Sequence, residues 1–179
     1  NMKARLISLS LFVAVALFAT DAFAQERNND RNRPSPNATV GQTIGTTIVE
    51  VTYGRPALRD RDAATLMPVG KVWRTGANES AAITFSDDVM VGDAEVPAGT
   101  YSLYTIPGDD AWTFIINKKL SWGTQYDESQ DVARVEGLLM NFPSPAESFT
   151  IFFDTLSDEK AHLNLVWGTT WAAVPITVK

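Results

Sequence analysis

Cysteine is absent from the sequence, and histidine occurs once, as His162. Without cysteine the chain forms no disulfide, thiolate nucleophile, iron–sulfur cluster or structural zinc site of the thiolate kind. A catalytic zinc site without thiolates needs two or three imidazoles, which one histidine does not supply. The sequence therefore predicts no metal site and a core stabilised by burial of apolar side chains alone.

Motifs for nucleotide binding and nucleophilic catalysis are also missing. The sequence has no phosphate-binding loop, no Gly-x-Gly-x-x-Gly dinucleotide motif and no Gly-x-Ser-x-Gly nucleophile elbow. Four acidic pairs fall at predicted turns but lack the spacing of a calcium-binding loop: Asp87-Asp88, Asp109-Asp110, Asp127-Glu128 and Asp158-Glu159. We interpret these pairs as solvated turns, and we expect no cofactor.

Positive charge is scarce, since 15 basic residues stand against 21 acidic ones and the net charge is −6. An acidic surface repels phosphate backbones and anionic lipid, so we expect no nucleic-acid partner and no adsorption to a membrane surface. Residues 55–74 are the exception, because basic residues outnumber acidic ones there: Arg55, Arg59, Arg61, Lys71 and Arg74 against Asp60 and Asp62. Arginine can hold a carboxylate or phosphate with two parallel hydrogen bonds, so this segment predicts an anionic ligand. Pairing with the protein's own acidic loops is the alternative.

Long hydrophobic runs are lacking except near the N-terminus. Lys3 and Arg5 precede an apolar run from Leu6 to Ala19, and Ala22-Phe23-Ala24 has the small residues of a signal-peptidase site. The run is shorter than the roughly 20 residues of a membrane span. We expect residues 1–24, in which Asn1 precedes the presumed initiator Met2, to be a cleaved signal peptide. The mature protein would be periplasmic or secreted, without a membrane anchor.

The mature chain is expected to contain a flexible leader and one β-rich domain. Residues 25–37 have no aliphatic or aromatic side chain to stabilise a fold, so we predict a flexible leader. Residues 38–179 predict a single all-β domain, an antiparallel β-sandwich or jelly-roll-like fold with one or two short helical turns. The turns are expected at residues 62–69 and 127–132.

Alternating apolar residues locate the clearest strands of this domain. We expect strands at 47–53 and 81–86, a hairpin formed by 101–106 and 112–117, and a terminal meander. The meander would comprise strands at 149–154, 161–167 and 171–178.

A tryptophan and an arginine precede a Gly-Asn turn at residues 73–79. A regular strand would place Trp73 and Thr75 on one face and Arg74 on the other, before a tight turn that ends at Glu79. These residues could form a pocket with an aromatic wall, a cation and a carboxylate. They could equally form a structural corner, in which Asn78 bonds its own backbone and Glu79 neutralises Arg74.

The same region carries a family resemblance. The run from Gly70 to Glu79, followed by Ile83-Thr84-Phe85, resembles an exported bacterial family catalogued as domain of unknown function 2911. Supporting stretches are residues 51–56 and 97–107, with Trp112 and the strand that follows it. The resemblance covers nearly the whole mature chain and implies export from Gram-negative bacteria, but no activity.

Three hypotheses for function remain open. The first is a non-enzymatic binding or envelope-associated module for a small anionic or sugar-like ligand, held by Arg55, Trp73, Arg74, Asn78 and Glu79. The second is a hydrolase or lyase acting on an envelope polymer, with Glu79 as the candidate catalytic acid or base. The third is a purely structural envelope component. The sequence does not indicate an oligomeric state.

Overall fold

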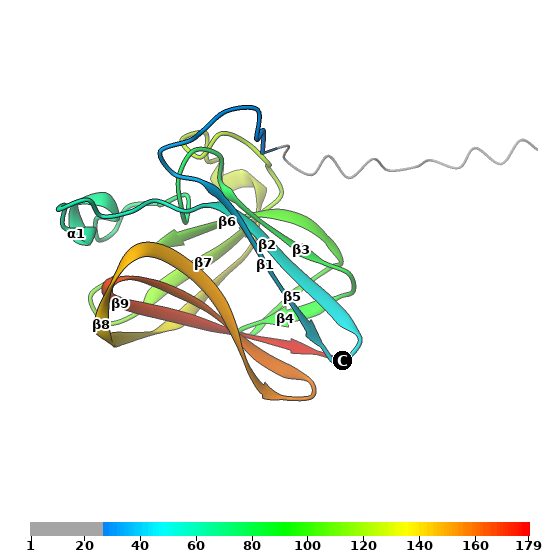
Figure 1. The fold of residues 1–179 in the computed structure, drawn as a ribbon. Helices are drawn as coiled ribbons and strands as arrows, with labels where there is room; N and C mark the ends of the chain where they lie inside the picture. Colours follow the sequence, from blue (N-terminus) through cyan, green and yellow to red (C-terminus); the bar gives the residue numbers. More distant parts are fainter. Residues whose placement is uncertain (1–26) are drawn as a thin grey trace, which may run out of the picture.

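The structure is a computed structural model that describes residues 27–179 (Figure 1). The predicted signal peptide lies outside the described residues. No helix in the described range has the length and apolar character needed to cross a membrane. In chain order the elements are β1 (Asn37–Ile44), β2 (Thr47–Gly54), α1 (Ala63–Leu66), β3 (Ala81–Phe85), β4 (Val89–Val91), β5 (Ala94–Val96), β6 (Gly99–Ile106), β7 (Trp112–Asn117), the 3-10 turn η1 (Glu128–Gln130), β8 (Asp131–Ser157) and β9 (Lys160–Val178).

The strands of residues 27–179 form one continuous sheet in the order β1-β2-β3-β6-β7-β8-β9-β4-β5. Every neighbouring pair is antiparallel, which confirms the predicted all-β antiparallel fold. The long strand β8 joins two halves of this sheet, because residues 131–137 pair with β7 and residues 138–157 pair with β9. Figure 1 shows β8 and β9 curving across the molecule toward β1 and β2.

Alternating burial explains why the clearest strands were predictable. In β2, Val49, Val51 and Tyr53 are buried while Ile48 and Glu50 are exposed. Strand β3, the β6–β7 hairpin and the short helical turns α1 and η1 also lie where the sequence predicts them. Burial of one face of each strand therefore determines most of the fold.

Two predicted elements differ in the structure. The expected final strand at 171–178 is continuous with the preceding strand in β9, which bends at Gly168, a glycine with a φ of 58°. The predicted strand leading into Trp73 is wrong, because residues 70–80 form a loop in which Trp73 makes only an isolated bridge with Thr105. The expected faces are nevertheless correct, since Trp73 and Thr75 are buried and Arg74 between them is partly exposed.

A single hydrophobic core lies between the two halves of the sheet. Tyr53 of β2 packs edge-on against Phe149 of β8, with ring centroids 5.5 Å apart. The Tyr53 hydroxyl also accepts a hydrogen bond of 3.1 Å from the backbone N–H of Ile151. Both contacts connect β2 to β8, so the halves face each other across the core as in an antiparallel sandwich.

Candidate functional site

The loop of residues 70–80 connects α1 to β3 and carries most of the predicted site residues. Its backbone is fixed against the β6 strand, where Trp73 and Thr105 exchange hydrogen bonds of 2.7 and 3.0 Å. Gly70 N–H donates to the carbonyl of Pro107 at 2.8 Å. The loop therefore extends the sheet beyond the end of β3 and holds its side chains in defined positions.

A close crossing of two backbone segments shapes this loop. Ala77 N–H donates to the carbonyl of Gly54 at 3.2 Å, where the loop passes the end of β2. A Cβ added to Gly54 would lie 2.2 Å from the Ala77 carbonyl oxygen, and one added to Gly76 would lie 2.6 Å from the Gly54 oxygen. Gly76 also has a φ of 145°. Only glycine fits at both positions. The crossing therefore brings residues 51–56 and 70–79, two stretches that carry the family resemblance, into close backbone contact.

The loop lines a cavity of about 300 Å³. Three of the predicted binding residues, Trp73, Arg74 and Asn78, are in its wall, and three residues absent from the predicted site complete its polar and aromatic sides: Ser35, Arg61 and Trp167. The structure thus brings together two arginines, an amide and two indole rings.

The two cavity arginines are held by backbone carbonyls. Arg74 Nη1 donates to the Asn78 carbonyl at 3.1 Å. Arg61 donates through Nε to Leu58 and through Nη2 to Ala57, both at 2.8 Å. No carboxylate in the described part of the chain lies within ion-pairing distance of either guanidinium. Each positive charge is therefore held in place without being neutralised by an ion pair.

Aromatic rings form the base of the cavity. Trp73 stacks on Trp167 with centroids 5.8 Å apart and meets Phe149 at 4.9 Å and Trp112 at 6.2 Å in edge-on contacts. Trp73 is only 7% exposed, so most of its surface belongs to the core. Trp73 and Trp167 thus connect the cavity wall to the buried aromatic cluster of the core.

Glu79 lies outside this cavity wall, in a buried cluster with two arginines from the segment before β1. Arg33 Nη1 donates to both carboxylate oxygens, at 3.0 and 2.8 Å, and Arg27 Nη1 lies 3.4 Å from Oε2. Burial on its own raises the pKa of Glu79, but the Arg33 hydrogen bond, a backbone hydrogen bond and both positive charges outweigh it. The pKa therefore lies below its usual value, and Glu79 is a carboxylate at neutral pH.

Arg55 is also separate from the cavity wall and connects two strands. Its Nε donates to the Phe149 carbonyl at 3.1 Å, and its Nη2 donates to the Thr150 hydroxyl at 3.0 Å. These bonds attach the residue after β2 to β8. Arg55 thus stabilises the contact between the halves of the sheet.

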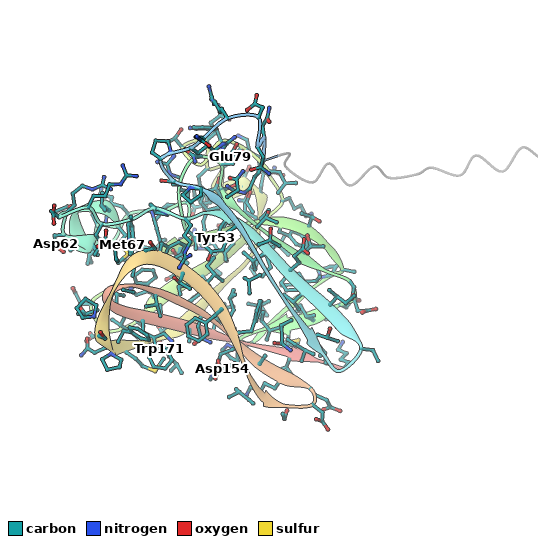
Figure 2. The ribbon with its side chains drawn as sticks, in the orientation of Figure 1. Tyr53, Asp62, Met67, Glu79, Asp154 and Trp171 are labelled. Atoms are coloured by element: carbon teal, nitrogen blue, oxygen red, sulfur yellow. The ribbon has the colours of Figure 1, made fainter. Side chains whose placement is uncertain are left out.

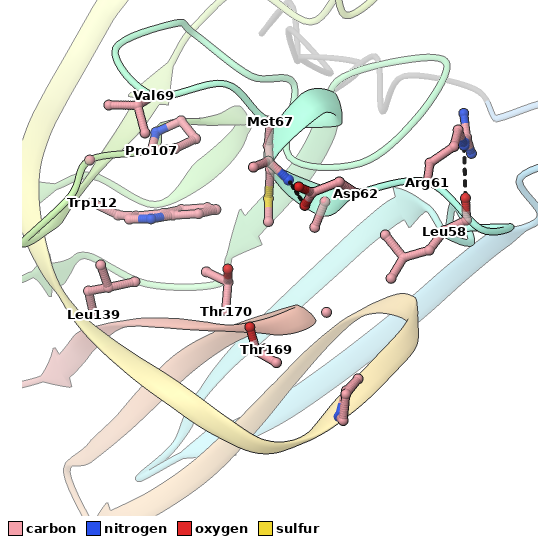
Figure 3. Close-up of a pocket in the computed structure, with 15 residues that line it drawn as sticks. Leu58, Arg61, Asp62, Met67, Val69, Pro107, Trp112, Leu139, Thr169 and Thr170 are labelled. Atoms are coloured by element: carbon pink, nitrogen blue, oxygen red, sulfur yellow. Dashed lines mark hydrogen bonds between the residues drawn. The ribbon is translucent and has the colours of Figure 1, made fainter.

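A second cavity, of about 400 Å³, is lined in part by the 58–67 segment (Figure 3). It is lined by Trp112, Met67 and Leu139, with the hydroxyl residues Thr169 and Thr170. Arg61 belongs to both cavities. Asp62 forms part of the wall and caps α1 by accepting from Ala64 N–H at 3.0 Å, so its free acceptor capacity is reduced.

Metal-ligating side chains do not gather in the described range. No group of three His, Asp or Glu residues within residues 27–179 could hold a metal ion. His162 is partly exposed on β9, with Nδ1 3.5 Å from Asp154 Oδ2. Neither residue lines the two cavities.

The site residues missing from the sequence prediction are distant in the chain from the 73–79 turn. Arg61 already belonged to the positive segment, and that charge excess is the sequence signal that could have identified it. Ser35, Arg27 and Arg33 lie in the predicted leader, whose composition gave no reason to expect contacts. Trp167 was expected at the end of a strand of the terminal meander, and no local pattern places it in the same cavity wall as Arg74.

Comparison with known protein families yields a match over most of the chain. A family model described as "Protein of unknown function (DUF2911)" matches residues 35–176, which include the cavity and Glu79. No curated protein and no solved structure matches the chain.

Proposed function

The chain belongs to the DUF2911 family of proteins of unknown function, and on that premise we propose that it is a non-enzymatic binding protein for a small anionic, sugar-like ligand. The ligand would bear a carboxylate or phosphate. Binding would take place in the periplasm or outside the cell, after removal of a signal peptide.

The observation that carries the proposal is the pair of guanidinium groups in one cavity. Arg61 and Arg74 both line the 300 Å³ cavity, and neither has an ion-pairing carboxylate among residues 27–179. Other basic side chains of residues 27–179 also lack an ion pair, but Arg61 and Arg74 are distinguished by lining the same cavity. A ligand carboxylate or phosphate would supply the missing counter-charge through bidentate hydrogen bonds.

The remaining walls fit a polar ring. Trp73 and Trp167 border the cavity with the small apolar surface that they leave exposed, 7% and 3%, while the Asn78 carboxamide, which donates to the Ser35 carbonyl, provides polar groups. A sugar ring has one apolar face and a polar edge, so it matches a site with one indole wall and one amide wall. This pairing supports a sugar acid or phosphorylated sugar over an inorganic anion alone.

Glu79 supports binding over hydrolysis. A general acid at neutral pH needs a raised pKa, whereas that of Glu79 is lowered by its arginine partners. Glu79 is also absent from the cavity wall that holds Arg74. The hydrolase hypothesis therefore has no acid in the cavity, within the described residues, that is prepared for proton donation.

The test is calorimetric titration with galacturonate, galactose and inorganic phosphate. We expect galacturonate to bind and galactose, its neutral counterpart, to bind at least about tenfold more weakly, because a charge-assisted hydrogen bond contributes about 1.5–3 kcal/mol. Arg74→Gln should weaken galacturonate binding by a similar factor. Lys160→Gln removes one charge from the exposed β8–β9 turn and should have no effect.

A second variant moves Arg74 without altering charge. A Cβ added to Gly123 would lie 2.6 Å from Arg74 Cβ and 2.2 Å from its Cδ, so Gly123→Ala must displace this side chain or the loop that carries residue 123. We expect it to weaken galacturonate binding as well. Absence of binding by both anions, or equal affinities of Arg74→Gln and Lys160→Gln, would contradict the proposed function.

A further inference from the structure

Residues 27–36, named here the strap, cross the end of the sheet and are anchored at Glu79. Arg27 Nη2 donates to the backbone carbonyls of Glu79 and Ser80, at 3.1 and 2.6 Å, in addition to its ion pair with the Glu79 carboxylate. Arg33 Nη1 adds a bifurcated contact with both oxygens of that carboxylate. The side chains of Arg27, Arg33 and Glu79 are only 6%, 13% and 10% exposed. Figure 2 places Glu79 at this end of the molecule, away from the core residue Tyr53.

The strap binds through charge and not through apolar burial. Between residues 27 and 36 its only carbon-rich side chains are prolines and arginine stems, so hydrophobic burial contributes little to its attachment. Cavities of about 340 and 310 Å³ lie along it, the second between the strap and Asn78 with Trp122. The strap therefore does not pack closely along its length.

Burial of the anchoring arginines carries a cost. The Nε atoms of Arg27 and Arg33 are buried and have no hydrogen-bond partner. Burial also lowers the pKa of Arg27 to about 10, even though Glu79 acts in the opposite direction. Removing a guanidinium from water with donors unpaired opposes docking, so the net free energy that holds the strap is smaller than two buried ion pairs suggest.

The end of the strap nearest β1 belongs to the cavity. Asn78 Nδ2 donates to the Ser35 carbonyl at 3.4 Å, and Arg59 Nη2 donates to the Pro34 carbonyl at 3.0 Å. Ser35 is itself part of the cavity wall. Movement of the strap would consequently remove one side of the cavity.

We propose that the strap is a releasable closure of the anion cavity, with Glu79 as its anchoring point. Closure of the cavity over a bound anion rests on the proposed function, whereas release of the strap from Glu79 does not. The family match begins at residue 35, so Glu79 lies inside the matched region and both anchoring arginines lie before it. Residues 27–34 of the strap thus precede the matched region, and residues 35–36 lie within it.

Limited trypsin digestion tests release without any ligand. Trypsin cleaves after arginine, and the bonds Arg27–Asn28 and Arg31–Asn32 lie in the strap. Cleavage of a docked segment requires transient release, so the rate follows the released population. In the full chain, Arg33→Gln should accelerate cleavage at both bonds at least about tenfold, because one partner of a buried ion pair is lost. Glu79→Gln should do the same, and Lys160→Gln should not.

Arg33→Gln is the decisive variant because Arg33 precedes the first strand and its loss leaves the core intact. Mass spectrometry identifies the cleaved bonds, and circular dichroism of the undigested variant reports whether the domain is folded. Cleavage at an unchanged rate in a folded Arg33→Gln variant would overturn the strap as an ionically anchored element.

Stopped-flow binding of galacturonate tests closure. The association rate constant should rise at least about threefold in Arg33→Gln, since a larger fraction of molecules has an open cavity. Faster cleavage with an unchanged association rate would overturn closure of the cavity. If galacturonate and phosphate do not bind the wild-type chain, the proposed function and closure fail together, while the digestion still decides whether the strap is released.

Discussion

At the scale of single residues, the structure separates two charged side chains that lie five positions apart in the sequence. Arg74 faces a cavity, whereas Glu79, expected as its possible counter-ion, is paired with Arg27 and Arg33. These partners precede Glu79 by 52 and 46 residues. Alternation within the turn predicted which side chains are buried, but no local pattern can predict an ion pair across so long a separation.

The lowered pKa of Glu79 leads to a prediction about stability at acid pH. A carboxylate whose pKa is lower in the folded than in the unfolded chain stabilises the fold above its unfolded value, which is near 4.5. This contribution is lost as pH falls through the lower folded value. The free-energy difference between wild type and Glu79→Gln should thus be largest at neutral pH and shrink below about pH 4.5.

Urea unfolding at a series of pH values measures this difference. The matched control is Glu50→Gln, which removes an exposed carboxylate from β2. We expect the control to stay close to wild type throughout. A wild-type to Glu79→Gln difference that is independent of pH would show that the Arg27 and Arg33 contacts do not stabilise the folded chain.

At the scale of elements, the predicted strands are those with a regular apolar face, even where the other face is buried as well, as in β6 and β7. Strands β2, β3, β6 and β7 each have one regular buried face, and all four were predicted. The first part of β8 was missed, although Ala133 and Val135 are buried and Arg134 and Glu136 are exposed, because polar residues and a helical turn precede it. Strands β4 and β5 have three residues each, too few for a pattern to be recognised.

The crossing of the 70–80 loop over β2 leads to a prediction at this scale. Gly76→Ala would place a Cβ 2.6 Å from the Gly54 carbonyl oxygen in a backbone conformation that disfavours alanine. We expect a loss of roughly 2–4 kcal/mol in the free energy of unfolding, from overpacking and backbone strain together.

Gly41→Ala is the control for this crossing. Gly41 lies in β1 with its nearest neighbour, the Val49 carbonyl oxygen, 3.6 Å from an added Cβ, so the variant should differ from wild type by less than about 1 kcal/mol. Denaturant unfolding compares the two variants. Equal stabilities would mean that the crossing adapts without strain and does not fix the loop that carries Arg74.

At the scale of the whole molecule, one strand makes the two halves a single unit. Because β8 pairs with β7 in its first part and with β9 in its second, the halves share backbone hydrogen bonds as well as a core. The aromatic cluster takes Trp73 and Trp112 from one half and Phe149 and Trp167 from the other. This long-range arrangement could not be predicted from local patterns. Such patterns identify individual strands, but they do not show that β8 pairs with β7 in one half and with β9 in the other.

Cooperative unfolding follows from this connection. Tryptophan fluorescence reports on the shared cluster, and far-ultraviolet circular dichroism reports on the sheet, so both should give one coincident urea transition.

Tyr53→Phe removes the acceptor of the buried Ile151 N–H, a bond between β2 and β8, and should lower the free energy of unfolding by about 1–3 kcal/mol. The slope of the transition should not change, because the surface exposed on unfolding is the same. Tyr101→Phe breaks only a local bond to the Pro97 carbonyl, four residues away, and should have a smaller effect. Separate transitions for the two probes, in wild type or in Tyr53→Phe, would show that the halves of the sheet unfold independently and that β8 does not couple them.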